Sequence, residues 1–170
     1  MQWGRRRYGG VLYDLTHLDP FVATVPGHNG AADLKARVRF GSHVFTLEWS
    51  ENYVDDYKVD DGGTPRCFCP TRYSHSAHPP GLIERHCAGR VLFDPQRKLV
   101  ILGNPPGVLS PYAIFFTMKK APRDKQYDVD IVVVSAHEHP RLKAKLGMPF
   151  PELARVVADG GAIPWPPKRK

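Results

Sequence analysis

The side chains most able to do acid–base, metal or phosphate chemistry gather in residues 66–87. Histidine and cysteine exchange protons near neutral pH and bind transition metals, while arginine grips a phosphate with paired N–H donors. The group comprises Arg66, Cys67, Cys69, Arg72, Tyr73, Ser74, His75, His78, His86 and Cys87. Two kinds of site fit these residue types: a metal-free site that acts on RNA, and a structural zinc site.

Metal-free cleavage of RNA through its 2′-hydroxyl needs a base, an acid and a cation that stabilises charge at phosphorus. We expect His43 or His137 to act as the base or the acid. Arg66 and Arg72 are expected to hold the phosphate as bidentate donors. Ser135 completes this candidate catalytic set, and no cofactor is expected. A single histidine such as His43 is also common as a half-buried packing group.

A polar pair ends the apolar run at 129–137. Alternation there predicts a strand in which Ser135 and His137 share the face of Ile131 and Val133. Such a position suits a functional site, and equally a strand that is leaving the core.

Zinc is the alternative for the same region. Its four ligands would be Cys67, Cys69, Cys87 and a histidine, His78 or alternatively His75. The Cys67–Cys69 spacing is tighter than in familiar structural zinc sites, so buried, apolar thiols are the simpler expectation. A nucleophilic cysteine beside Arg66 or Arg72 is a further alternative.

The sequence lacks the motifs that identify several common enzyme classes. The chain contains no phosphate-binding P-loop, no Gly-x-Gly-x-x-Gly and no Gly-x-Ser-x-Gly. His137 and His139 lack the helical spacing of a zinc-protease pair.

The charge balance favours a polyanionic partner. Lys and Arg number 24 against 17 Asp and Glu, a net charge of +7, which suits RNA. The runs Arg5–Arg7 and Lys168–Lys170 supply most of the surplus, so we expect it to act mainly through flexible tails. The expected nucleic-acid contacts are Arg37, Arg39, Lys168, Arg169 and Lys170. Three cysteines and no long apolar run favour a cytoplasmic protein without a membrane partner.

The pattern of apolar residues predicts an α+β fold, mainly antiparallel sheet. Alternating runs at 34–40 and 43–49 around Gly41-Ser42 predict an N-terminal type II′ hairpin that pairs Phe40 with His43. Helical spacing predicts a short middle helix at 81–88 and a C-terminal helix at 150–159. Further strands are expected at 21–25, 90–93, 98–102, 112–119 and 129–136, with an edge strand in the acidic loop 50–65. We expect a basic segment at 1–19, a single domain at 20–163 and a Pro-rich basic tail at 164–170.

Several segments resemble a group of small, largely uncharacterised bacterial proteins, often phage- or plasmid-associated and sometimes labelled for growth adaptation. They are Leu15–Phe21, Arg37–Thr46, Arg66–Ser74, Tyr112–Phe116 and Asp130–Ala136. The helix followed by antiparallel strands is also similar in architecture to ribonuclease toxins of the RelE and barnase–EndoU–colicin type. These resemblances imply a small RNA-acting protein, an endoribonuclease toxin with a cognate antitoxin. The alternative is a non-catalytic module that binds nucleic acid or protein, with or without a structural zinc.

Overall fold

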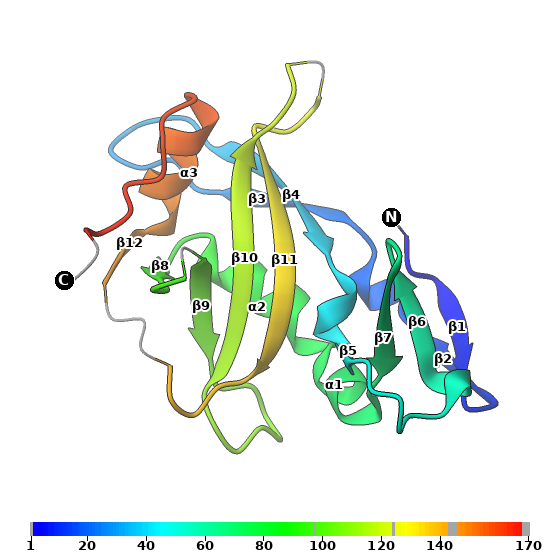
Figure 1. Ribbon diagram of the computed structural model, residues 1–170. Coiled ribbons are helices and arrows are strands. Elements are labelled where there is room, and N and C mark those ends of the chain that lie inside the picture. Colours follow the sequence, from blue (N-terminus) through cyan, green and yellow to red (C-terminus); the bar gives the residue numbers. More distant parts are fainter. Residues whose placement is uncertain (1, 97, 124, 143–145, 168–170) are drawn as a thin grey trace.

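A computed structural model describes residues 2–96, 98–123, 125–142 and 146–167 (Figure 1). Its strands and helices confirm the α+β class with mainly antiparallel pairing. The strands are β1 (Arg5–Tyr8), β2 (Val11–Asp14), β3 (Phe21–Val25), β4 (Leu34–Phe40), β5 (Thr46–Glu48), β6 (Lys58–Asp61), β7 (Thr64–Phe68), β8 (Arg90–Phe93), β9 (Leu99–Gly103), β10 (Tyr112–Lys120), β11 (Val129–Glu138) and β12 (Gly147–Pro149). The helices are α1 (Pro70–His75), α2 (His78–His86) and α3 (Phe150–Ala158), with 3-10 turns η1 (Thr16–Leu18), η2 (Ser42–Val44) and η3 (Asp55–Tyr57).

Three sheets share these strands. The largest has the order β12-β8-β9-β10-β11-β4-β3, and its β4–β11 pair is parallel while the other pairs are antiparallel. A smaller sheet has the order β5-β7-β6, and β1 pairs with β2 alone. The smaller sheets and α1 lie beside the carboxyl end of β4, on the right of the large sheet in Figure 1.

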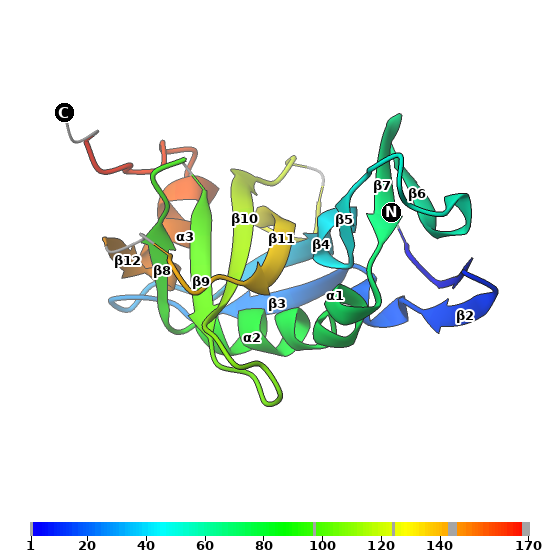
Figure 2. The same ribbon diagram turned by 60° about the horizontal axis from the view of Figure 1, so that its bottom comes forward.

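The large sheet buries one face against helices α2 and α3. Alternation along β4 puts its apolar residues on that face, and its basic residues point to the other. Helix α3 adds Leu153, Ala154 and Val157, and Phe150 stacks on Phe116 of β10. Figure 2 shows α1 and α2 beneath the sheet. The helices predicted at 81–88 and 150–159 are confirmed as α2 and α3, although α2 begins three residues earlier, directly after α1.

The predicted hairpin of 34–40 with 43–49 is wrong. Strand β4 pairs with β3 and β11, whereas β5 pairs with β7 in another sheet. His43 lies on η2, not opposite Phe40. Alternation shows that a segment is a strand with one buried face, and it does not name the neighbouring strand. The hairpin nearest the N-terminus is β1–β2, and it places Arg5–Arg7 in a strand instead of a flexible tail.

Strand β11 carries a β-bulge before its carboxyl end. Phe115 pairs with Ser135 and Phe116 with Val133, so Val134 is the extra residue. A bulge reverses the face to which the later residues of a strand point.

The bulge decides where the polar end of β11 points. Val133 and, after the bulge, Ala136 both belong to the main core. Ser135 and His137 therefore lie on the opposite face. The prediction that they share the face of Ile131 and Val133 is wrong, because alternation continues unbroken only without a bulge.

Candidate functional site

The carboxyl ends of β4 and β11 meet at one edge of the sheet because these strands are parallel. The backbone N–H of Gly41 donates to the carbonyl of Val133 at 2.8 Å, one residue beyond β4. A Cβ on Gly41 would lie 3.3 Å from that oxygen, so glycine lets the chain turn closely past the bulge. The ends of adjacent parallel strands are a common location for binding sites.

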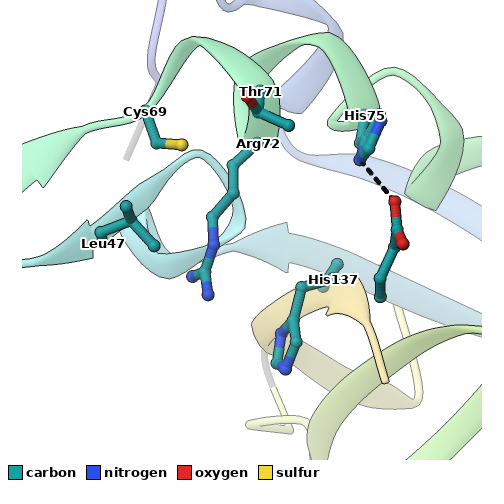
Figure 3. A pocket seen from close by; sticks show the side chains of 8 residues that line it. Leu47, Cys69, Thr71, Arg72, His75 and His137 are labelled. Carbon is teal, nitrogen blue, oxygen red and sulfur yellow. Dashed lines mark ion pairs between the residues drawn. The ribbon is translucent and has the colours of Figure 1, made fainter. Parts of the chain in front are cut away.

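A pocket of about 270 Å³ opens at this edge. Its walls come from the end of β11, from β5 and from α1 with the residue before it. It is lined by Leu47, Cys69, Thr71, Arg72, His75, Ala136, His137 and Glu138 (Figure 3). It therefore combines an arginine, two histidines and a carboxylate.

Helix α1 positions Arg72 in the pocket wall. Its Nη1 donates to the carbonyl oxygens of His43, at 3.1 Å, and Thr46, at 2.7 Å. These bonds fix the guanidinium between η2 and β11, on the side to which the ring of His137 points (Figure 3). Arginine stays charged at neutral pH, so Arg72 is a permanent cation in the pocket.

His137 is held neutral in this setting. Burial lowers the pKa of His137 to about 4, and the positive charges of Arg72 and Lys98 and the neighbouring His139 add to the effect. The ring stacks on Phe115 at a centroid distance of 5.5 Å. Among the described residues, the Nδ1 atoms of His137 and His139 are buried without a hydrogen-bond partner.

His75 lies across the pocket from Leu47 and Cys69 (Figure 3), and it pairs with Glu138. His75 Nδ1 lies 4.0 Å from Glu138 Oε1, and Ser110 Oγ donates to Glu138 Oε2 at 2.7 Å. The Tyr112 hydroxyl donates to the carbonyl of His75 at 3.3 Å. The carboxylate is therefore fixed from one side and can orient the imidazole from the other. These two residues did not stand out in the sequence as a pair, because nothing local connects α1 with the end of β11.

His43 belongs to a separate cluster beside the pocket. Its Nε2 lies 3.6 Å from Asp61 Oδ2, which also accepts from Ser42 Oγ at 2.7 Å. Burial and the charges of Arg66 and Arg72 lower the pKa of His43 despite the opposing effect of Asp61. The side chain does not line the pocket.

Arg66 is buried in the small sheet. Its Nε donates to Thr46 Oγ1 at 2.7 Å, and the hydroxyl of Thr46 donates in turn to the carbonyl of Ser42 at 2.8 Å. This places Arg66 in a structural network that supports η2.

The remaining predicted residues, catalytic Ser135 and the nucleic-acid contacts, lie elsewhere. Ser135 faces the same side of the sheet as His137 but does not line the pocket. Arg37 and Arg39 lie on the face of β4 away from the helices. The predicted contacts Lys168, Arg169 and Lys170 lie outside the described residues.

The alternative zinc ligands do not assemble. No group of three or more His, Cys, Asp or Glu residues with metal-binding geometry occurs in the described part of the chain. Cys87 belongs to the main core, where burial raises the pKa of its thiol to about 11. Cys67 is buried in β7, and all three cysteines are free. The expectation of small buried thiols fits Cys67 and Cys87, whereas Cys69 reaches the pocket.

The described helices include none that is long and apolar enough to cross a membrane. No curated protein matches this chain significantly, and no solved structure does. The model of the YjaZ family matches residues 5–156, which is most of the sequence. The chain therefore belongs to the YjaZ family.

Proposed function

We propose that the protein is a metal-independent endoribonuclease that cleaves RNA by attack of a ribose 2′-hydroxyl on the adjacent phosphate. The observation that supports this most is the pocket at the carboxyl end of β11, which brings Arg72, His137 and the His75–Glu138 pair together. These are the residue types that such a reaction needs.

His137 is the proposed general base. A base must be unprotonated before the reaction, and a pKa of about 4 keeps His137 neutral at pH 7. Bound phosphate beside Arg72 would offset part of the positive field that lowers this pKa. The base would then be stronger in the complex than in the free protein.

His75 is the proposed general acid. The carboxylate of Glu138 can hold a proton on Nδ1 and so direct Nε2 toward the pocket. Ser110 fixes that carboxylate and limits its rotation.

Arg72 would hold the phosphate and stabilise the charge that builds up on it. Its Nη1 is occupied by backbone carbonyls, so the group is rigidly placed before substrate arrives. Rigid donors of this kind cost little reorganisation in the transition state.

The step balances without any cofactor. His137 takes the proton of the 2′-hydroxyl, the 2′-oxygen bonds to phosphorus, and the P–O5′ bond breaks. His75 gives a proton to the departing 5′-oxygen. The products are a 2′,3′-cyclic phosphate and a free 5′-hydroxyl.

The setting of this activity is part of the proposal. The pocket is smaller than a typical site for a whole small molecule, which suits one linkage of a longer polymer. Three free cysteines suit a reducing cytoplasm. We place the protein there as a growth-inhibiting toxin held in check by a protein antitoxin.

The test is incubation of purified protein with RNA in excess EDTA. We expect fragments that end in 2′,3′-cyclic phosphate, and no cleavage of the same RNA carrying 2′-O-methyl groups. Intact RNA under these conditions would reject the enzyme. Tight RNA binding without cleavage would favour the non-catalytic binding module instead.

A further inference from the structure

The large sheet has one face that no helix covers within the described residues (Figures 1 and 2). The helices α2 and α3 pack on the other face, with the main core. The uncovered face is formed by β4, β11 and β10, and the bulge in β11 turns Ser135 and His137 onto it. It is therefore continuous with the proposed catalytic pocket.

Basic side chains outnumber acidic ones on this face. Register places Arg37 of β4 beside Asp130 of β11, and Asp130 beside Lys119 of β10. Asp130 forms an ion pair with Arg39. No carboxylate of the described residues forms an ion pair with Arg37 or Lys119, so their charge is available to a ligand.

An aromatic ring accompanies the charge. The guanidinium of Arg37 lies 5.5 Å from the ring centre of Tyr127, and Arg37 Nη1 donates to the tyrosine hydroxyl at 2.9 Å. Flat cations and aromatic rings are the groups on which unpaired bases stack. The positive charge of Lys98 acts on both His43 and His137.

We propose that this face binds single-stranded RNA, with Arg37, Tyr127 and Lys119 as a remote subsite that leads the strand to the pocket. The inference rests on the proposed function for the identity of the ligand. Asp130 and His137 are seven positions apart on β11, and the bulge at Val134 leaves about six residues at 3.3 Å each, or roughly 20 Å, between them. That length accommodates several nucleotides of an extended strand.

The test uses a fluorescent 2′-O-methyl RNA of about twelve nucleotides, which binds without being cleaved. Fluorescence anisotropy compares Arg37→Glu/Lys119→Glu with the control Arg85→Glu/Lys120→Glu. Arg85 is exposed on α2, and Lys120 follows Lys119 on β10 but faces the other side. Both variants change the net charge equally.

We expect the first variant to bind at least about tenfold more weakly, with the salt dependence of log K reduced by about 1.4 for two lost phosphate contacts. Lys119→Glu alone changes an exposed residue and should give about half of that change in slope. Cleavage of a diribonucleotide, which is too short to reach Arg37, should be unchanged.

Equal binding by the two double variants would overturn the inference. So would competition by polyglutamate as effective as that by RNA, since the face would then be a site for acidic polypeptides. If the diribonucleotide is not cleaved by any form but long RNA still requires Arg37 and Lys119, the enzyme proposal fails and the binding face stands.

Discussion

Two clusters in this protein have the same composition and different surroundings. Each combines a serine, a carboxylate and a histidine: Ser42, Asp61 and His43 in one, and Ser110, Glu138 and His75 in the other. In both, the serine donates to the carboxylate and not to the histidine. Neither is therefore the nucleophilic triad of a serine hydrolase, in which the histidine must take the serine proton.

The surroundings separate the two clusters. His75 and Glu138 line a pocket that also holds Arg72 and the neutral His137. His43 lies outside that pocket, and Arg72 donates to its carbonyl oxygen. Residue types alone therefore do not mark a reaction centre. A cation and an acid–base pair must share one cavity.

The largest effect on RNA cleavage should come from replacing Arg72, the cation of the pocket. We expect Arg72→Ala to lower RNA cleavage by at least about a thousandfold, because the transition-state charge loses its fixed partner. It should also cost about 1 to 3 kcal/mol of unfolding free energy, since two carbonyls lose their donor. Initial rates on a diribonucleotide and urea unfolding measure the two effects.

Arg66→Lys is the matched control for that experiment. It disturbs the buried network with Thr46 and should lower stability while leaving the cleavage rate within about threefold. If Arg72→Ala and Arg66→Lys lose cleavage to the same extent at equal unfolding free energy, the pocket would not differ in function from the buried Arg66–Thr46 network.

The next effect concerns pH and stability. His137 has a pKa of about 4 in the folded protein against 6.5 without its surroundings. Between these values the unfolded chain binds a proton that the folded protein does not, so stability falls as pH falls. From pH 7 to pH 4.5, wild type should lose about 2 to 3 kcal/mol more than His137→Gln.

Urea unfolding at both pH values measures this difference. His43→Gln is the control, because the side chain of His43 is 40% exposed and its lowered pKa should contribute less. An identical loss in wild type and His137→Gln would show that His137 is not held neutral.

Replacing the carboxylates of Glu138 and Asp61 should have smaller and unequal effects on the cleavage rate. Glu138→Gln keeps an acceptor for Ser110 but removes the charge that orients His75, so cleavage should fall about tenfold. Asp61→Asn makes the same change in the other cluster and should alter the rate less than about twofold. Steady-state cleavage rates of Glu138→Gln and Asp61→Asn measure this difference. A larger loss of rate in Asp61→Asn than in Glu138→Gln would assign the chemistry to His43.

The smallest effect is expected at Ser135. Its side chain lies on the face of His137 but does not line the pocket. Ser135→Ala should therefore change cleavage less than about twofold, within normal variation for an uninvolved residue. A hundredfold loss would require the pocket to extend along the open face of β11.

Much of the fold follows from local patterns, and the site does not. Alternation predicted β3 and β4 as strands because a half-buried strand needs that period, and runs that are apolar on both faces predicted β10 and β11 as central strands. The partner of β4 was missed because 21–25, 43–49 and 129–133 are equally suitable neighbours on apolar pattern alone. The bulge at Val134 was missed because it falls within an unbroken run of valines.

The site illustrates the same limit. His137, Arg72 and His43 were chosen by type, and the structure brings the first two into one pocket. His75 joins them through Glu138, an interaction between distant segments that local sequence does not encode.

The most direct measurement compares His137→Ala with His43→Ala in cleavage of a single-stranded RNA in EDTA. The proposed mechanism predicts that His137→Ala loses at least about a hundredfold in rate, while His43→Ala stays within about threefold of wild type. In cells, expression of His43→Ala should slow growth as wild type does, and His137→Ala should not. A large loss in His43→Ala with His137→Ala still active would contradict the central claim.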